Sequence, residues 1–184
     1  MGSPLLNFNG LANGTEVNGL VVSGVTFSYT LGGTPTNGAV IIDGGPGTTN
    51  NIAPPNIVSV GNNSGIVGVT LPSPATLFGY GFAILDVGAV ANATTISLFM
   101  GSTPVGSLSY SGASDPLFTG GFAGIQSTIP FNRAELTFNS LVAPAFAVDN
   151  ITYSNPLPEP ATASMVLSAL ALACAAWRQR PFRR

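Results

Sequence analysis

Short runs of alternating apolar and polar residues recur throughout residues 1–155, and they constrain the fold more than any other feature of the sequence. The runs are rich in β-branched and aromatic residues, and clusters of Gly, Pro, Asn and Ser separate them. This pattern is typical of β-strands joined by turns. In residues 134–139, Leu136 and Phe138 fall on one face and polar residues on the other, as expected of a strand with one buried face. No window before residue 161 shows a helical apolar stripe, so we expect an all-β body.

The alternating segments are predicted strands at 20–30, 39–42, 57–60, 66–71, 76–86, 94–100, 105–110, 120–126, 134–139 and 146–153. This many short strands fit a two-sheet β-sandwich, a jelly roll, folded as one domain over residues 1–155. Within this body, Phe78, Tyr80 and Phe82 alternate with two glycines. The three rings either fill the core of the sandwich or, on a solvent-facing sheet, form a platform for sugar rings.

Charged side chains are scarce and unevenly distributed. They make up 7% of the sequence, against about 25% in an ordinary soluble domain. The first 177 residues hold all seven acids and a single base, Arg133, which is a net charge of −6. A body with one base cannot neutralise phosphates, so we expect no nucleic-acid partner.

Missing residue types exclude most familiar enzyme chemistry. The sequence contains no His and no Lys, and its single Cys is Cys174. The chain therefore cannot build a Ser-His-Asp triad, a histidine-bound zinc site, a Schiff-base lysine or a P-loop. Two carboxylates would suffice for a hydrolase, but the spacing of the six acids before the tail singles out no pair. We therefore expect a protein that is not an enzyme.

The C-terminal segment differs from the body. Residues 161–177 contain no charge and no proline, and a helix of this length would be about 25 Å long, at the short end of the range for a membrane span. The run Pro-Leu-Pro-Glu-Pro at 156–160 precedes it, and residues 178–184 contain four arginines. This order predicts a linker, one transmembrane anchor helix and a cytoplasmic basic end. The alternative is a buried C-terminal helix of the domain, which would usually carry a polar stripe.

The tail resembles the PEP-CTERM sorting signal of Gram-negative bacteria, in which Pro-Glu-Pro precedes an apolar helix and an arginine-rich end. The resemblance assigns Pro158, Glu159 and Pro160 to the recognition motif and 161–177 to the anchor. It assigns membrane retention to Arg178, Arg180, Arg183 and Arg184. It implies export, an intermediate anchored in the inner membrane, and an exosortase as partner, with cleavage near Pro-Glu-Pro. Family members begin with a secretion signal, which residues 1–4 do not supply, so we expect one upstream of Met1.

The two ends of the body are similar to secreted jelly-roll domains of the carbohydrate-binding-module type. The segments that carry this likeness are 7–11, 13–17, 24–27 and 146–151. The resemblance implies that the first and last strands lie side by side. It also implies a structural calcium ion held by Asp149 of the last strand, with Glu16 as the nearest N-terminal carboxylate.

Two features of these segments leave the calcium ion open. Related domains tend to carry acids where this chain has Asn9, and an amide lowers the charge of a calcium site. The other interpretation of Asp149-Asn150 is a bulge or turn at the end of a strand.

Together these observations predict an exported protein of the cell envelope or extracellular matrix, displayed on the cell surface or released. We expect a structural or glycan-associated component whose partner is an envelope or matrix polysaccharide. The first alternative is a calcium-stabilised carbohydrate-binding module. A carboxylate-pair hydrolase and an ice-binding surface are further alternatives, the latter needing a flat, regular threonine array, although the threonines show no repeat period.

Overall fold

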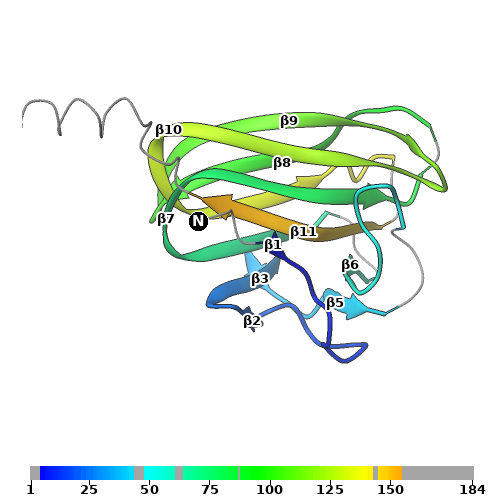
Figure 1. Cartoon of the computed structure of the whole chain (residues 1–184), viewed down its shortest axis with the longest axis horizontal. Coiled ribbons are helices and arrows are strands. Elements are labelled where there is room, and N and C mark those ends of the chain that lie inside the picture. Colours follow the sequence, from blue (N-terminus) through cyan, green and yellow to red (C-terminus); the bar gives the residue numbers. More distant parts are fainter. Residues whose placement is uncertain (1–4, 44–47, 61–63, 87, 143–144, 155–184) are drawn as a thin grey trace, which may run out of the picture.

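The computed structural model describes residues 5–43, 48–60, 64–86, 88–142 and 145–154. All regular secondary structure in these ranges is β-strand, which confirms the all-β prediction (Figure 1). The strands are β1 (Leu5–Leu6), β2 (Val21–Val22), β3 (Val25–Leu31), β4 (Thr34–Pro35), β5 (Ala39–Ile42), β6 (Asn56–Ser59), β7 (Ile66–Ile84), β8 (Val90–Met100), β9 (Thr103–Asp115), β10 (Phe118–Phe138) and β11 (Phe146–Ser154).

The predicted linker at 156–160, the anchor at 161–177 and the arginine-rich end at 178–184 lie outside the described residues. Within the described ranges, no helix has the length and hydropathy needed to cross a membrane.

The described strands form one continuous antiparallel sheet that folds over on itself into two packed layers. The N-terminal half of β7 pairs with β3 and with the C-terminal half of β10, which also pairs with β8. This side, extended by β9, is the β8 layer. The C-terminal half of β7 pairs with the N-terminal half of β10 and with β11, and β6 and β5 follow beyond β11. This side is the β11 layer, so the sandwich consists of two layers of one sheet rather than two separate sheets.

The strands β7 and β10 bend together where they pass from one layer to the other (Figure 1). Their register shifts between Gln126 and Phe131. At this bend the exposed residues include Pro72 and Pro74 of β7 and Pro130 of β10. Proline cannot donate a hydrogen bond to a strand ladder, so it suits a place where the ladder is interrupted. The predicted strands 66–71 and 76–86 are therefore one strand, bent at its prolines.

Aromatic side chains fill the space between the two layers. Phe138 of the β8 layer stacks on Phe146 of the β11 layer, with ring centroids 3.9 Å apart. Tyr80 is fully buried, and its hydroxyl donates to the hydroxyl of Thr94 in the opposite layer. Thr94 in turn donates to the carbonyl oxygen of Thr137 at 2.9 Å. The buried phenol is thus satisfied, as a tyrosine in a core requires.

The first and last described strands lie side by side, as the resemblance to carbohydrate-binding modules implied. Leu5 pairs with Thr152 and Leu6 with Ile151. The register of β11 against β7 shifts between Asp149 and Thr152, and Asn150 there has a φ of 51°. Asparagine tolerates this left-handed conformation better than most residues. The structure therefore shows a bulge at Asp149-Asn150, as one interpretation predicted, but it lies within β11 rather than at the end of a strand.

Candidate functional site

The alternating aromatic residues of β7 belong to the core. The exposed fractions of Phe78, Tyr80 and Phe82 are 3%, 0% and 0%. Neighbouring ring centroids lie 6.1 and 6.2 Å apart along the strand. Of the two interpretations made from the sequence, the core assignment is confirmed, and these rings do not form a solvent-facing platform.

The glycines between those rings shape the opposite, outer face of the β11 layer. Gly79 pairs with Gly124 across β7 and β10, and Gly81 pairs with Phe122. Because paired residues and every second residue share a face, all four lie on the outer face. The Phe122 ring lies over Gly79, since a Cβ atom there would be 2.7 Å from the ring's Cζ. Phe122 is 51% exposed, so its aromatic ring lies over these glycines and faces solvent.

A cavity of about 310 Å³ opens beside this ring, between β7, β10 and β11. We call it the Phe122 pocket, and it is lined by Leu77, Phe78, Gly79, Phe122, Gly124, Ile125, Gln126, Thr152, Tyr153 and Ser154. No charged side chain belongs to this lining. The pocket is therefore neutral and mostly apolar, with amide and hydroxyl groups among its lining residues.

Residues 48–52 cover another part of this outer face, over Gly81 and Gly120. Ile52 is 2% exposed and packs with Val58, Ala83 and Ala147. Gly81 permits this close approach, because a Cβ there would collide with the Ile52 side chain.

Asp115 of β9 holds the covering loop in place. Its Oδ1 accepts a hydrogen bond from the backbone N–H of Asn50, and its Oδ2 accepts one from Nδ2 of Asn51, both at 3.1 Å. On the other side of the loop, Nδ2 of Asn150 donates to the carbonyl oxygen of Asn51 at 2.7 Å. The Phe122 pocket is therefore open on the same face to which this loop is attached.

Asp149 is a buried carboxylate on this same layer. It pairs with Gly81 of β7 and is 4% exposed. Its Oδ1 accepts no hydrogen bond from any described residue. Burial raises the pKa of the Asp149 carboxyl from 3.8 to about 6, and a hydrogen bond from the backbone of Asn150 partly offsets this effect. Desolvation disfavours the charged form of an acid, so burying the ionised carboxylate lowers the free energy of unfolding.

Glu16 does not lie beside Asp149 in the described structure. Glu16 is exposed and forms an isolated bridge with Val40 of β5. Strand β6 then lies between β5 and β11, so the backbones of the two acids are separated by about three strand spacings, roughly 14 Å. Among the described residues, no group of three or more acid, His or Cys side chains gathers in one place. The pair does not fit a shared calcium site, and calcium at Asp149 stays a prediction.

Phe122 was not predicted as a site residue, although the sequence around it contains a signal. The run Gly120-Gly121-Phe122-Ala123-Gly124 contains one large residue among small ones. Period-2 alternation places Phe122 on the same face as Gly120 and Gly124. A large apolar residue whose neighbours on its face are glycines has little to pack against, so it tends to stay partly exposed. The sorting residues Pro158, Glu159 and Pro160 and the four tail arginines lie outside the described residues.

Comparison with solved structures finds two kinds of neighbour. The catalytic domain of a GH87 α-1,3-glucanase in complex with nigerose is 12% identical, with a TM-score of 0.39 over 73% of this chain. This chain spans 28% of that protein's length. A family 29 carbohydrate-binding module is 14% identical, with a TM-score of 0.36 over 74% of this chain and 98% of the module. At TM-scores this low, neither likeness bears on what this chain binds.

Comparison with protein families addresses the tail. No curated protein matches the chain as a whole. The model of the PEP-CTERM protein-sorting motif matches residues 156–184. This match covers the linker, the apolar segment and the arginines that the sequence analysis assigned to one signal, and it indicates export. The chain is therefore a β-sheet protein that carries a PEP-CTERM protein-sorting motif at its C-terminal end.

Proposed function

We propose that this protein is a non-catalytic component of the cell envelope or extracellular matrix that binds a neutral polysaccharide through the Phe122 pocket. Its tail directs it to an exosortase in the inner membrane of a Gram-negative bacterium, through Pro158, Glu159 and Pro160. After sorting, the body is displayed on the cell surface or released.

The observation that carries the glycan assignment is the exposed Phe122 ring beside a neutral cavity. One face of a pyranose ring is rich in C–H groups, which pack favourably on an aromatic face. The side chains of Gln126 and Thr152 in the lining can donate and accept hydrogen bonds to sugar hydroxyls. A net charge of −6 on the first 177 residues disfavours acidic polysaccharides.

Affinity electrophoresis of the full chain tests this proposal. The protein is run in native gels containing dextran, hydroxyethylcellulose or galactomannan, and in gels containing alginate as the acidic contrast. A polyoxyethylene detergent is used, because glycosidic detergents would compete. We expect retardation in at least one neutral gel and none in alginate. Unchanged mobility in all three neutral gels would contradict the proposal.

Two variants locate the binding at the pocket. Phe122→Ala removes the ring, and Gly79→Ala places a methyl group where the ring now lies, 2.7 Å from its Cζ atom and 3.1 Å from the carbonyl oxygen of Ala123, so the ring must move aside and the β10 backbone must shift slightly. Both should reduce retardation at least several-fold without loss of the folded state. The matched control is Leu117→Ala, since Leu117 is 64% exposed and does not line the pocket. If both pocket variants are retarded as strongly as the unmutated chain, the polysaccharide does not bind at the Phe122 pocket.

Sorting is tested separately by fusing residues 156–184 to an exported reporter. In a cell with an exosortase, the reporter should pass through a membrane-bound intermediate, because four arginines resist translocation while the apolar segment stays in the bilayer. Replacing Pro158, Glu159 and Pro160 by alanine should leave that intermediate unprocessed. A reporter whose fate is the same with and without the enzyme would refute this part.

The structure offers less support for the other functions considered from the sequence. Glu135 pairs with Arg133 on the outer face of the β8 layer, whereas Asp149 lies in the β11 layer and Asp115 binds loop amides. Both carboxylate oxygens of Asp115 accept hydrogen bonds from loop amides, and Asp149 is 4% exposed, so these carboxylates do not form the open, facing pair that a glycosidase needs. On the β8 layer, Ser and Thr side chains do line up in register, but Arg133 and Glu135 interrupt the array that an ice-binding surface would need.

A further inference from the structure

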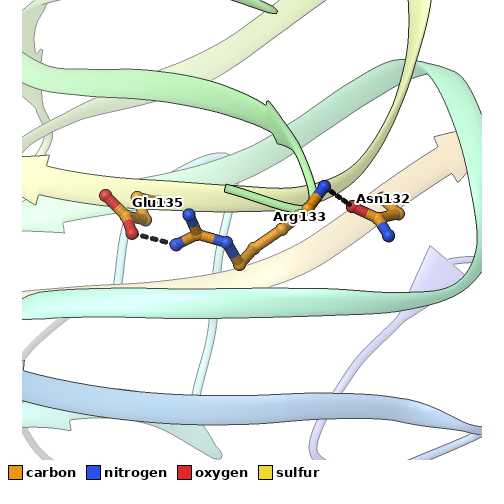
Figure 2. Close-up of polar contacts among 4 residues, drawn as sticks. Asn132, Arg133 and Glu135 are labelled. Atoms are coloured by element: carbon orange, nitrogen blue, oxygen red, sulfur yellow. Dashed lines mark hydrogen bonds and ion pairs between the residues drawn. The ribbon is translucent and has the colours of Figure 1, made fainter. Parts of the chain in front are cut away.

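Arg133, the single base of the body, occupies a fixed position on the outer face of the β8 layer. Its guanidinium carbon lies 4.1 Å from the centroid of the Phe99 ring, and its Nη1 pairs with Oε1 of Glu135. Figure 2 shows the two side chains meeting along β10. Beside them, Oδ1 of Asn132 accepts a hydrogen bond from the backbone N–H of Gly101 at 2.9 Å, which ties the turn after β8 to the same place (Figure 2).

Hydroxyl groups extend this polar site across the neighbouring strands. Glu135 pairs with Ser97 of β8, and Ser97 pairs with Ser107 of β9. The two serine hydroxyls lie 3.2 Å apart, and Ser107 also donates to the carbonyl oxygen of Ile96. On the other side of Glu135, Gly68 has no side chain, and the hydroxyl of Ser28 lies in that space.

The ion pair is accessible and has a specific hydrogen-bonding capacity. The side chains of Arg133 and Glu135 are 30% and 27% exposed, and an exposed pair of this kind contributes little to stability. Guanidinium offers several N–H donors in a planar fork, and a carboxylate accepts several hydrogen bonds. Because Phe99 holds the guanidinium in place, less side-chain freedom is lost when a ligand binds.

Neighbouring hydroxyls of a sugar ring fit this arrangement, since each hydroxyl both donates and accepts. The pair has no net charge, so it suits a neutral sugar better than a phosphate or a uronic acid. The acidic body points to the same ligand class. We propose that Arg133 and Glu135, with the adjacent serines, form a second saccharide-binding site, and that the protein bridges two polysaccharide chains through its opposite faces.

The bridging step rests on the proposed function of the Phe122 pocket, whereas the Arg133 site stands on its own geometry. The outer faces of the two layers point away from each other, because their inner faces enclose the common core. Two polysaccharide chains, one at each face, would therefore bind to separate surfaces of the protein. Two linked sites also bind a polymer more tightly than either does alone.

The Arg133 site is tested first by itself. The full chain, labelled with ¹⁵N at arginine, contains five arginines, and the Arg133 Nε–H signal is the one missing in Arg133→Lys. Methyl glucoside, methyl mannoside and methyl galactoside are raised into the tens of millimolar. We expect at least one to shift the Arg133 signal in the unmutated chain and in Phe122→Ala, and to do so much less in Glu135→Gln. Glu16→Gln is the matched control, because it removes an exposed carboxylate elsewhere. No shift with any of the three glycosides would overturn the site.

Bridging is then measured as the turbidity of the neutral polysaccharide that retards the protein in gels. The unmutated chain should give a maximum at an intermediate protein-to-polysaccharide ratio. Phe122→Ala and Arg133→Met should each abolish turbidity while melting as the unmutated chain does. Light scattering without polysaccharide measures whether the protein associates with itself. If it does, and Arg133→Met still gives full turbidity with polysaccharide, the bridging proposal is wrong.

The outcomes separate the two proposals. If Arg133→Met bridges normally and Phe122→Ala loses all retardation, the second site is wrong and the pocket stands. If Phe122→Ala retains full retardation and Arg133→Met loses it, the pocket is wrong, bridging is wrong, and the Arg133 site is the saccharide site. Loss of turbidity in both variants, with partial retardation in each, supports bridging.

Discussion

Asp149 makes folding depend on pH at the scale of a single residue. Its carboxyl has a pKa of about 6 in the folded chain, above the ordinary value of 3.8, because it is buried. The folded state therefore binds this proton more tightly than the unfolded state does. The resulting stability is fully present below about pH 4 and is lost as the pH rises through about 6. A shift of this size corresponds to about 3 kcal/mol of unfolding free energy.

We predict that Asp149→Asn raises the melting temperature at pH 7.5 and makes little difference near pH 4. The amide keeps the shape of the carboxyl but carries no charge to desolvate. Melting curves of both proteins in the presence of a chelator measure the difference, and Glu16→Gln serves as an exposed-acid control. A lower melting temperature for Asp149→Asn at pH 7.5 would contradict the prediction. If calcium raises the melting temperature of the unmutated chain but not that of Asp149→Asn, a cation binds at Asp149.

At the scale of elements, the segment 48–52 depends on contacts with strands distant in sequence. The backbone N–H of Thr49 donates to the carbonyl of Ile52 at 3.0 Å, and the Thr49 hydroxyl accepts from the N–H of Ile52 at 3.2 Å. These bonds close the turn but do not attach it to the sheet. Attachment comes from the buried Ile52 side chain and from the hydrogen bonds of Asp115 and Asn150.

We predict that Asp115→Ala releases this segment without unfolding the sandwich. Hydrogen bonds to a charged acceptor on a partly exposed loop contribute about 1–2 kcal/mol. Hydrogen exchange at the Thr49 and Ile52 amides should therefore become several-fold faster, while core amides of β7 and β10 keep their protection. Glu16→Ala is the comparison for removing an exposed acid elsewhere. Equal protection of the loop in the variant and the unmutated chain would show that Ile52 alone holds it.

At the scale of the whole molecule, the two layers share their longest strands. Because β7 and β10 run through both layers and pair with each other in each, neither layer can unfold without disrupting strands that the other layer needs. Every residue of the described core lies between Leu6 and Tyr153. We predict that a fragment of residues 1–155 folds alone and unfolds in one cooperative step, with far-ultraviolet and tyrosine circular dichroism changing together. A helix content above about a fifth, or two separate transitions, would contradict this prediction.

The sequence by itself determined the class of the body and the nature of the tail. Strand periodicity is local, since each run of alternating residues specifies its own buried face, and every predicted segment lies in a strand region. The predicted strand 20–30 is the hairpin of β2 and β3, whereas 66–71 with 76–86 and 120–126 with 134–139 are the single strands β7 and β10. The pairing of the first and last strands was implied by the resemblance to carbohydrate-binding modules, and a bulge or turn at Asp149-Asn150 was one of two interpretations. The two-residue strands β1 and β4 were not predicted, because segments this short show no period.

Tertiary structure alone decided which residues meet. The segments 66–71 and 76–86 were predicted as separate strands, yet β7 continues through Pro72 and Pro74 and pairs with β10 on both sides of the bend. The separation of Glu16 from Asp149, and the meeting of Phe122 with Gly79 and of Arg133 with Phe99, depend on strand order and register. Register joins residues far apart in the chain, and a shift of one residue would turn every side chain to the opposite face. Local alternation cannot specify such pairings, so the two faces became visible only in the folded chain.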